Sequence, residues 1–307
     1  MFEKFLFRSL AAVAVAALLA TSAGADTITH GGTTIGMEFV TVGNPHNPDD
    51  THGDGYGSVG YTYRIGTYEV NENQWDAVVA ANTGDLLDDP GYWSGFQPVA
   101  HISWHEAAMF CNWLTSGDVT QGAYTINGSG EVTAVDRETA VTTHGTVYVI
   151  PTEDEWYKAA YYDPGKSGGA GYWDYPTKHD DPSVPDGIDD SGDTDPGDFD
   201  AVFYDGYDQG QPNNDDNAGV LSAYGTMGQG GNVWEWNETL IGSSRGVRGG
   251  GWYYDSGDLH ASGRGIIYPA VEDNIVGFRV ASIPEPGSIT LLVCGTVAGL
   301  MWWRRRK

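Results

Sequence analysis

Cysteine is nearly absent from this sequence, whose 307 residues include only Cys111 and Cys294. Cys294 lies in a C-terminal apolar run, residues 289–303, so Cys111 is the only thiol in the rest of the chain. No intramolecular disulfide can then form there, which is acceptable for a domain of this size. A helical spacing of apolar residues places the thiol on a buried face, where it is a poor nucleophile. The residues on this face are Ala107, Phe110, Cys111 and Leu114.

Basic residues are also scarce, because only 15 Lys and Arg stand against 42 Asp and Glu. From Asp26 to Trp303 the counts are nine and 41, which leaves a net charge of −32. Such a surface repels phosphate backbones and excludes nucleic acid as a partner, but it suits divalent cations. Long helical periodicities are rare, whereas glycine and aromatic residues are abundant. This composition predicts an irregular, loop-rich domain with tryptophans in its core.

The N-terminal residues 1–25 have the three parts of a secretory signal peptide. Lys4 and Arg8 supply the positive start, residues 10–20 are apolar, and residues 23–25 (Ala-Gly-Ala) form a small-residue cleavage site. The alternative is a retained membrane anchor, for which the apolar run is short. We expect an exported mature protein that begins at Asp26.

The C-terminal residues 282–307 combine a short motif, Pro284, Glu285 and Pro286, with the apolar run 289–303 and a final Arg-Arg-Arg-Lys. The basic end would stay in the cytoplasm while the apolar segment spans the inner membrane. This tail resembles the PEP-CTERM sorting signal of Gram-negative bacteria. The resemblance implies an exosortase as processing partner, and then the cell surface or the extracellular matrix as destination. An ordinary C-terminal anchor is the alternative.

Three glycine, tryptophan and arginine motifs lie between these ends, in residues 26–281, which we interpret as one domain. They are residues 231–236 (Gly-Asn-Val-Trp-Glu-Trp), 248–252 (Arg-Gly-Gly-Gly-Trp) and 277–280 (Gly-Phe-Arg-Val). In this order they resemble the formylglycine-generating enzyme family, also called the sulfatase-modifying factor domain. The resemblance implies an α+β fold, irregular and loop-rich, of the C-type-lectin-like kind.

The same resemblance predicts where catalytic residues would stand. In catalytic members the glycine turn, which corresponds to residues 249–251 here, is followed by two cysteines that hold copper and activate oxygen. In this sequence Tyr254 and Leu259 occupy the two places. A phenol and an alkyl chain cannot replace soft thiolate ligands, so we expect no copper and no catalytic residue of this kind.

A calcium ion is the cofactor that the resemblance does imply. In the family, the motif around residue 231 forms a cage of oxygen ligands. Matched position by position, the carbonyls of Gly228, Gly231 and Val233 and the carboxylate of Glu235 would hold a structural calcium ion. A second family calcium site begins with Asn, where this chain has Val202, so that site is doubtful.

Three patterns that contain acids or histidines are interpreted as helix starts, in preference to metal-binding or catalytic sites. Asn71 with Gln74, Ser103 with Glu106 and Thr152 with Glu155 have the spacing of capping boxes. The second pattern lies among His101 and His105, whose spacing also suits metal ligands, but a helix that starts after His101 need not put both on one face. The acids at 153–155 invite a general acid–base assignment, although helix capping explains them.

The most acidic segment, residues 180–200 within an insertion at about 174–218, contains nine aspartates and no Lys or Arg. Five oxygen-bearing residues have nearly the spacing of a calcium loop: Asp189, Ser191, Asp193, Asp195 and Asp200. Thr194 stands where an EF-hand requires glycine, so the loop is not an EF-hand. Its alternatives are a disordered acidic insertion and a loop ordered by calcium.

Two classes of function follow. The first is a non-catalytic, calcium-stabilised binding module outside the cell, with exopolysaccharide, another glycan or a surface protein as ligand. The alternative is an oxygen-dependent oxidase of the formylglycine-generating type that acts on a sulfatase cysteine, or another metal-dependent oxidase on the same fold. The remaining histidines, such as His144, His179 and His260, are scattered along the sequence.

Overall fold

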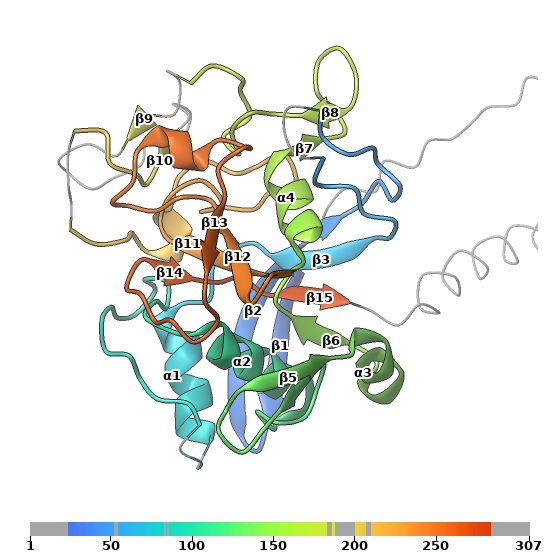
Figure 1. Ribbon diagram of the computed structural model, residues 1–307, viewed down its shortest axis with the longest axis vertical. Coiled ribbons are helices and arrows are strands. Elements are labelled where there is room, and N and C mark those ends of the chain that lie inside the picture. Colours follow the sequence, from blue (N-terminus) through green and yellow to red (C-terminus); the bar gives the residue numbers. More distant parts are fainter. Residues whose placement is uncertain are drawn as a thin grey trace, which may run out of the picture.

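The computed structural model describes residues 24–51, 55–82, 84, 86–182, 186–187, 200–206 and 210–283. These residues form a mixed α+β fold in which two sheets occupy the centre (Figure 1). The α-helices are α1 (Glu72–Ala81), α2 (Trp104–Ser116), α3 (Arg137–His144) and α4 (Glu153–Tyr161), and short 3-10 helices cover Asp215–Asn217 and Ser256–Leu259. The strands are β1 (Gly24–His30), β2 (Thr33–Val42), β3 (Tyr63–Gly66), β4 (Tyr124–Ile126), β5 (Val132–Val135), β6 (Val147–Val149), β7 (Tyr162–Asp163), β8 (Gly171–Tyr172), β9 (Asp186–Gly187), β10 (Asp200–Ala201), β11 (Trp234–Ile241), β12 (Ser244–Arg248), β13 (Gly265–Ile267), β14 (Val276–Gly277) and β15 (Ala281–Ile283).

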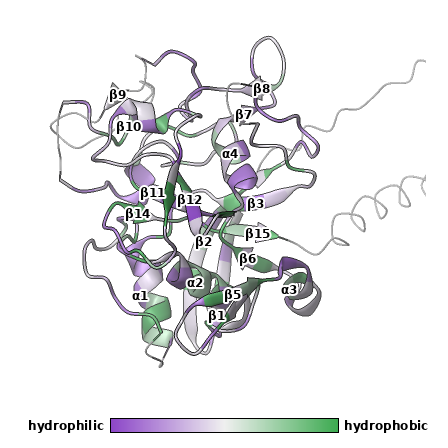
Figure 2. Cartoon of the chain, viewed as in Figure 1, coloured by the Kyte–Doolittle hydropathy of each residue, from purple (hydrophilic) through white to green (hydrophobic). Residues whose placement is uncertain are grey.

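The larger sheet has the strand order β1-β2-β3-β15-β6, and every neighbouring pair is antiparallel. Its strand β15 comes from the end of the described chain, yet it lies between β3 and β6. There Ala281 pairs with Ile65 on one side and with Val149 on the other. Figure 2 shows β6 and β15 in hydrophobic colours at this junction. The late strand β15 thus joins two early parts of the domain.

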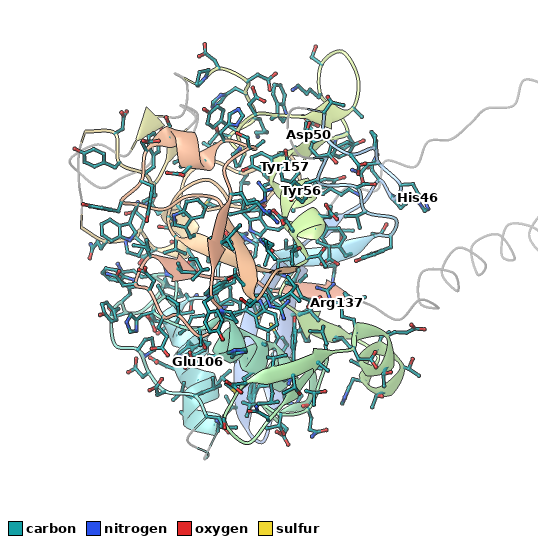
Figure 3. The ribbon with its side chains drawn as sticks, viewed as in Figure 1. His46, Asp50, Tyr56, Glu106, Arg137 and Tyr157 are labelled. Atoms are coloured by element: carbon teal, nitrogen blue, oxygen red, sulfur yellow. The ribbon has the colours of Figure 1, made fainter. Side chains whose placement is uncertain are left out.

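Two hydrophobic cores lie on opposite faces of this sheet, as the alternation of strand residues requires. On β2, Met37 and Phe39 face the core that includes the buried side of α1 and α2. Val40 and Val42 face a second core that includes Trp156 and other aromatic residues of α4. Figure 3 shows side chains filling the space beside α4.

The smaller sheet, with the order β13-β12-β11-β14, brings the three sequence motifs together. Glu235 on β11 pairs with Arg248 on β12 and, on the other side, with Gly277 on β14. These residues belong to motifs up to 42 positions apart in the sequence, so the sheet explains why the motifs occur as a set. Helix α4 packs against β11 from the side of the second core.

The three capping boxes are confirmed. Asn71, Ser103 and Thr152 cap α1, α2 and α4, and each accepts a hydrogen bond from the backbone N–H three residues later. His101 lies before the start of α2 with φ of 61°, so it does not share a helix face with His105. All four residues of the predicted apolar face of α2 are buried, including Cys111.

Several predictions fall outside the described residues. These are most of the signal peptide, the sorting motif Pro284, Glu285 and Pro286 with the apolar run 289–303, and four of the five positions of the candidate calcium loop. Asp200 is the exception and is buried on β10. Among the described residues no helix is long and apolar enough to cross a membrane. The predicted α+β, loop-rich fold is confirmed.

Candidate functional site

Glu235, the carboxylate of the tryptophan motif, forms a fully buried ion pair with Arg279 of the third motif. Nε and Nη2 of Arg279 each donate to one carboxylate oxygen at 2.6 Å. The indole Nε1 of Trp156 donates to the same carboxylate at 2.8 Å. Arg279 also donates to the backbone carbonyls of Gly66 at the end of β3, of Thr67 directly after it, and of Met227 in the loop before β11. This pair therefore joins the two sheets and α4 in the centre of the domain.

A second buried carboxylate, Glu69, lies next to this pair and is a site residue that the sequence did not predict. Its Oε2 accepts a hydrogen bond of 2.7 Å from the side chain of Asn232, which adopts φ of 61°. Burial raises the pKa of Glu69 well above its usual range, and the charge of Glu235 raises it further. Gly228 packs directly on Glu69, because an added Cβ would lie 2.8 Å from Oε2. Glu69 lies two residues before the cap Asn71, and its burial depends on tertiary packing that no local sequence pattern indicates.

The residues predicted as a calcium cage come together in the turn before β11. Gly228 and Gly231 have φ of 76° and 88°, so both depend on glycine for their conformation. Glu235 points into the core, where Arg279 already balances its charge. The Glu235–Arg279 pair is neutral overall, so Glu235 does not offer a free negative charge to a cation. The predicted set of ligands therefore fits calcium poorly. The calcium site at Gly228, Gly231, Val233 and Glu235 stays a prediction.

The two positions of the family's cysteine pair have packing roles. Leu259 is buried against Tyr175, Ala201 and Phe203, and its carbonyl accepts a hydrogen bond of 3.0 Å from Tyr161. Tyr254 packs edge-on against Trp234, with ring centroids 5.6 Å apart. The thiol of Cys111 lies in α2 with no exposed surface, and burial raises its pKa well above the usual value. The low pKa of a reactive thiol is therefore missing.

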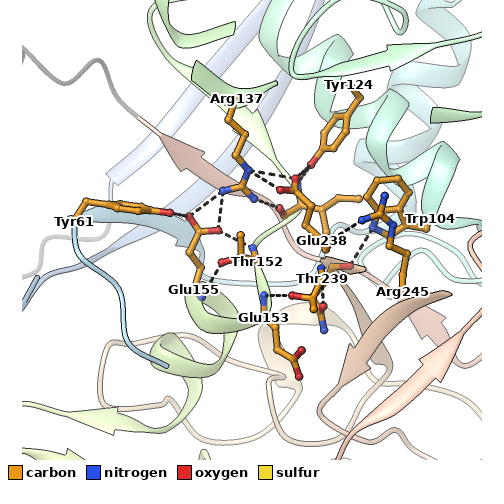
Figure 4. A network of polar contacts seen from close by, with 12 residues as sticks. Tyr61, Trp104, Tyr124, Arg137, Thr152, Glu153, Glu155, Glu238, Thr239 and Arg245 are labelled. Carbon is orange, nitrogen blue, oxygen red and sulfur yellow. Dashed lines mark hydrogen bonds and ion pairs between the residues drawn. The ribbon is translucent and has the colours of Figure 1, made fainter. Parts of the chain in front are cut away.

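Two of the acids at the start of α4, Glu153 and Glu155, are held in ion pairs, and Figure 4 shows the pairing of Glu155 with Arg137. Arg137 donates to both carboxylate oxygens of Glu155 at 3.0 Å and pairs with Glu238 at 2.9 Å. Burial alone would raise the pKa of Glu155, but Arg137 brings it below its ordinary value. Glu153 accepts hydrogen bonds from Arg248 and Arg264 at 2.7 and 2.6 Å. These pairings support the capping interpretation over general acid–base chemistry.

The histidines do not gather at one place. His105 accepts a hydrogen bond of 3.1 Å from the backbone of Val132, and His260 lies 3.8 Å from Asp174. Within the described part of the chain, no group of three ligating side chains includes a histidine.

Five aromatic residues from two loops form a continuous chain of ring contacts, which we call the aromatic face. They are Tyr92, Trp93, Trp252, Tyr253 and Tyr254, with successive ring centroids 5.5 to 6.3 Å apart. Two of these rings are exposed to solvent: Tyr92 is 48% exposed and Tyr253 is 58% exposed. Trp252 is largely buried between them, and its Nε1 has no hydrogen-bond partner among the described residues. The face includes Tyr254, one of the two positions of the family's cysteine pair, whereas the other, Leu259, is buried in a separate cluster.

Comparisons with known proteins agree with this architecture. The structure superposes on Treponema denticola variable protein 1 with a TM-score of 0.54 and 22% identity, covering 85% of this chain and 99% of the other. PvdO from Pseudomonas aeruginosa gives a TM-score of 0.51 and 17% identity, covering 80% of this chain and 94% of the other. These values show a shared fold. No curated protein sequence matches the chain.

Residues 58–283 match the model of the sulfatase-modifying factor enzyme 1-like domain. This span contains both the buried Glu235–Arg279 pair and the aromatic face. Because the match covers most of the sequence, the chain belongs to the family of sulfatase-modifying factor enzyme 1-like domains.

Proposed function

We propose that this protein is a non-catalytic binding module that acts outside the cell. The observation that carries the proposal is the replacement of the thiolate pair by Tyr254 and Leu259, which pack into the domain. No other cysteine can supply the pair, because Cys111 is buried in a distant helix and Cys294 lies near the C-terminus. An oxidase of the formylglycine-generating type would need two accessible thiolates at this turn.

The aromatic face is the proposed binding surface. The exposed rings of Tyr92 and Tyr253 offer flat apolar surfaces of the kind that stack on ligands, and each also has a polar hydroxyl. The strongly negative charge of the chain disfavours polyanionic ligands. An uncharged polysaccharide therefore fits the face better than an acidic one.

Export and sorting complete the proposal. The N-terminal signal would direct the chain out of the cytoplasm, and an exosortase would process the C-terminal tail after its transit through the inner membrane. The domain would then display its aromatic face at the cell surface or in the matrix. Redox metals have no part in the proposed activity.

Elemental analysis of the purified exported protein, supplied with calcium, copper and iron, tests the non-catalytic assignment. Neither copper nor iron in stoichiometric amount is the expected result. Stoichiometric copper or iron would overturn the assignment and favour the oxidase alternative.

Affinity electrophoresis in gels that contain an uncharged polysaccharide tests the binding surface. We expect retardation of the native protein and its loss in Tyr92→Ala and Tyr253→Ala. The matched control is Leu240→Ala, because Leu240 is 62% exposed and lies on β11 outside the aromatic face. Equal retardation of all four proteins would contradict a role for the face.

A further inference from the structure

Three carboxylates converge at the start of α1, far along the chain from the glycine turn. Glu72 and Asp76 lie one helical turn apart, and Asp89 comes from the loop that follows the helix. One oxygen from each of the three lies within 4.8 Å of the others. Two ligands on opposite sides of a calcium ion are about 5 Å apart, so this spacing suits three ligands of one ion.

Glu72 distinguishes this cluster from an ordinary group of surface acids. Its side chain is only 2% exposed, and its Oε1 is buried without a hydrogen-bond partner. The backbone N–H of Trp93 donates to the carboxyl group, which fixes its orientation. A buried carboxylate oxygen without a partner costs stability in a folded protein. Asp76 and Asp89 are exposed, so water can reach the cluster from outside.

No basic side chain compensates the three acids within the described part of the chain. Burial raises the pKa of Glu72 to about 7, and the charges of Asp76 and Asp89 act in the same direction. Burial and Asp89 also raise the pKa of Asp76. The negative charges around Glu72 thus oppose its ionisation, and a divalent cation among the three carboxylates would reverse this effect.

We infer that Glu72, Asp76 and Asp89 form a binding site for a divalent cation, with Ca²⁺ as the matching ion. The ligands are all oxygens, and only three come from these side chains, so water completes the coordination. Ca²⁺ tolerates such an irregular set better than Mg²⁺, which demands near-octahedral geometry. The site is separate from the turn before β11 that contains Gly231, and it does not depend on the function proposed above.

The cation has a structural consequence for the loop after α1. Asp89 lies three residues before Tyr92, and the Trp93 backbone contacts Glu72. A cation that joins Asp89 to Glu72 and Asp76 therefore fixes the segment that carries the first two rings of the aromatic face. Without the ion, repulsion among the acids favours a looser loop.

The test uses the full-length protein and Ca²⁺ alone, with the substitution Glu72→Gln. Without calcium we expect Glu72→Gln to melt at a higher temperature than the native protein, because a neutral amide replaces a repelled carboxylate. With calcium we expect the melting temperature of the native protein to rise more than that of Glu72→Gln. The native protein should then melt at the higher temperature. Glu138→Gln is the matched control, because Glu138 is an exposed acid in the first turn of α3.

Terbium luminescence supplies a second measurement, since Trp75 and Trp93 lie beside the cluster and can sensitise a bound lanthanide. The indole of Trp75 donates to the carbonyl of Asp88 at 2.9 Å, next to Asp89. We expect the apparent affinity for Ca²⁺ in competition with terbium to fall about tenfold or more in Glu72→Gln. The double variant Asp76→Asn with Asp89→Asn alters only exposed groups and should show the same loss. Native calcium response in both variants would overturn the site.

Discussion

Arg279 holds both carboxylate oxygens of Glu235 in the centre of the domain, at 2.6 Å each. The two residues come from different motifs, and neither side chain has any exposed surface. A buried pair of this kind is tightly coupled, since removal of one partner leaves the other charge without compensation. The presence of Glu235 in the first motif and of Arg279 in the third is thus explained by this buried ion pair.

The substitution Glu235→Gln should therefore lower the free energy of unfolding by about 3–5 kcal/mol. The loss should be the same with and without calcium, because it comes from Arg279. Denaturant unfolding in both conditions measures it, with Glu138→Gln as control. A loss that appears only in calcium would instead support the ion cage predicted at Gly228, Gly231 and Val233.

Gly231 should be the least replaceable glycine of the turn before β11. It has φ of 88°, and an added Cβ would lie 2.2 Å from the carbonyl oxygen of Val202. Gly231→Ala should cost about 3 kcal/mol or more, through backbone strain and this clash. Gly242→Ala is the control, because Gly242 has φ of 64° but open space around it, which predicts a cost of about 1 kcal/mol. Equal unfolding midpoints for the two variants would contradict the close approach.

The thiol of Cys111 should resist modification in the native protein. Its burial and raised pKa both suppress the thiolate that reacts with alkylating reagents. Site-resolved mass spectrometry after iodoacetamide treatment should find Cys111 unmodified under native conditions and fully modified in denaturant. Rapid native modification would show that this part of α2 opens readily.

Glu72 predicts a particular pH dependence in the absence of calcium. Its pKa of about 7 lies above the unfolded value, so the folded state binds more protons between about pH 4.5 and 7. The contribution of Glu72 to stability should therefore decrease as pH rises through this window. The groups that face it, Asp76 and Asp89, are both acids and act in the same direction on its pKa.

Unfolding midpoints between pH 5 and 8 in a chelator check this expectation. The native protein should lose stability relative to Glu72→Gln as pH rises, whereas Glu138→Gln should follow the native protein. A constant difference between native protein and Glu72→Gln would mean that Glu72 ionises without cost.

Local signals in the sequence predicted local structure well. The three capping boxes and the buried face of α2 depend on residues within a few positions of one another, where spacing determines geometry. The motifs also predicted the fold through their resemblance to a family. The pairings of Glu155 with Arg137 and of Glu153 with Arg264 join residues 18 and 111 positions apart. Only tertiary packing selects such partners, because several acids and bases have equivalent local surroundings.

The aromatic face and the acidic cluster were missed for the same reason. Trp93 and Trp252 lie on separate loops, with rings in contact at 6.2 Å, and neither loop has a periodic pattern. In the cluster, Glu72 and Asp76 are neighbours on α1, but the approach of Asp89 depends on the path of the loop. The unpartnered Oε1 of Glu72 becomes evident only when the packing around it is known.

The position of β15 constrains the order in which this protein can mature. Its three residues, Ala281–Ile283, pair with β3 on one side and with β6 on the other. Until the ribosome has made β15, β6 is therefore not joined to the rest of the larger sheet. A nascent chain that has emerged only as far as β14 cannot complete its main sheet, and non-local pairings of this kind form late. The larger sheet can therefore close only after nearly all of the described domain has been made.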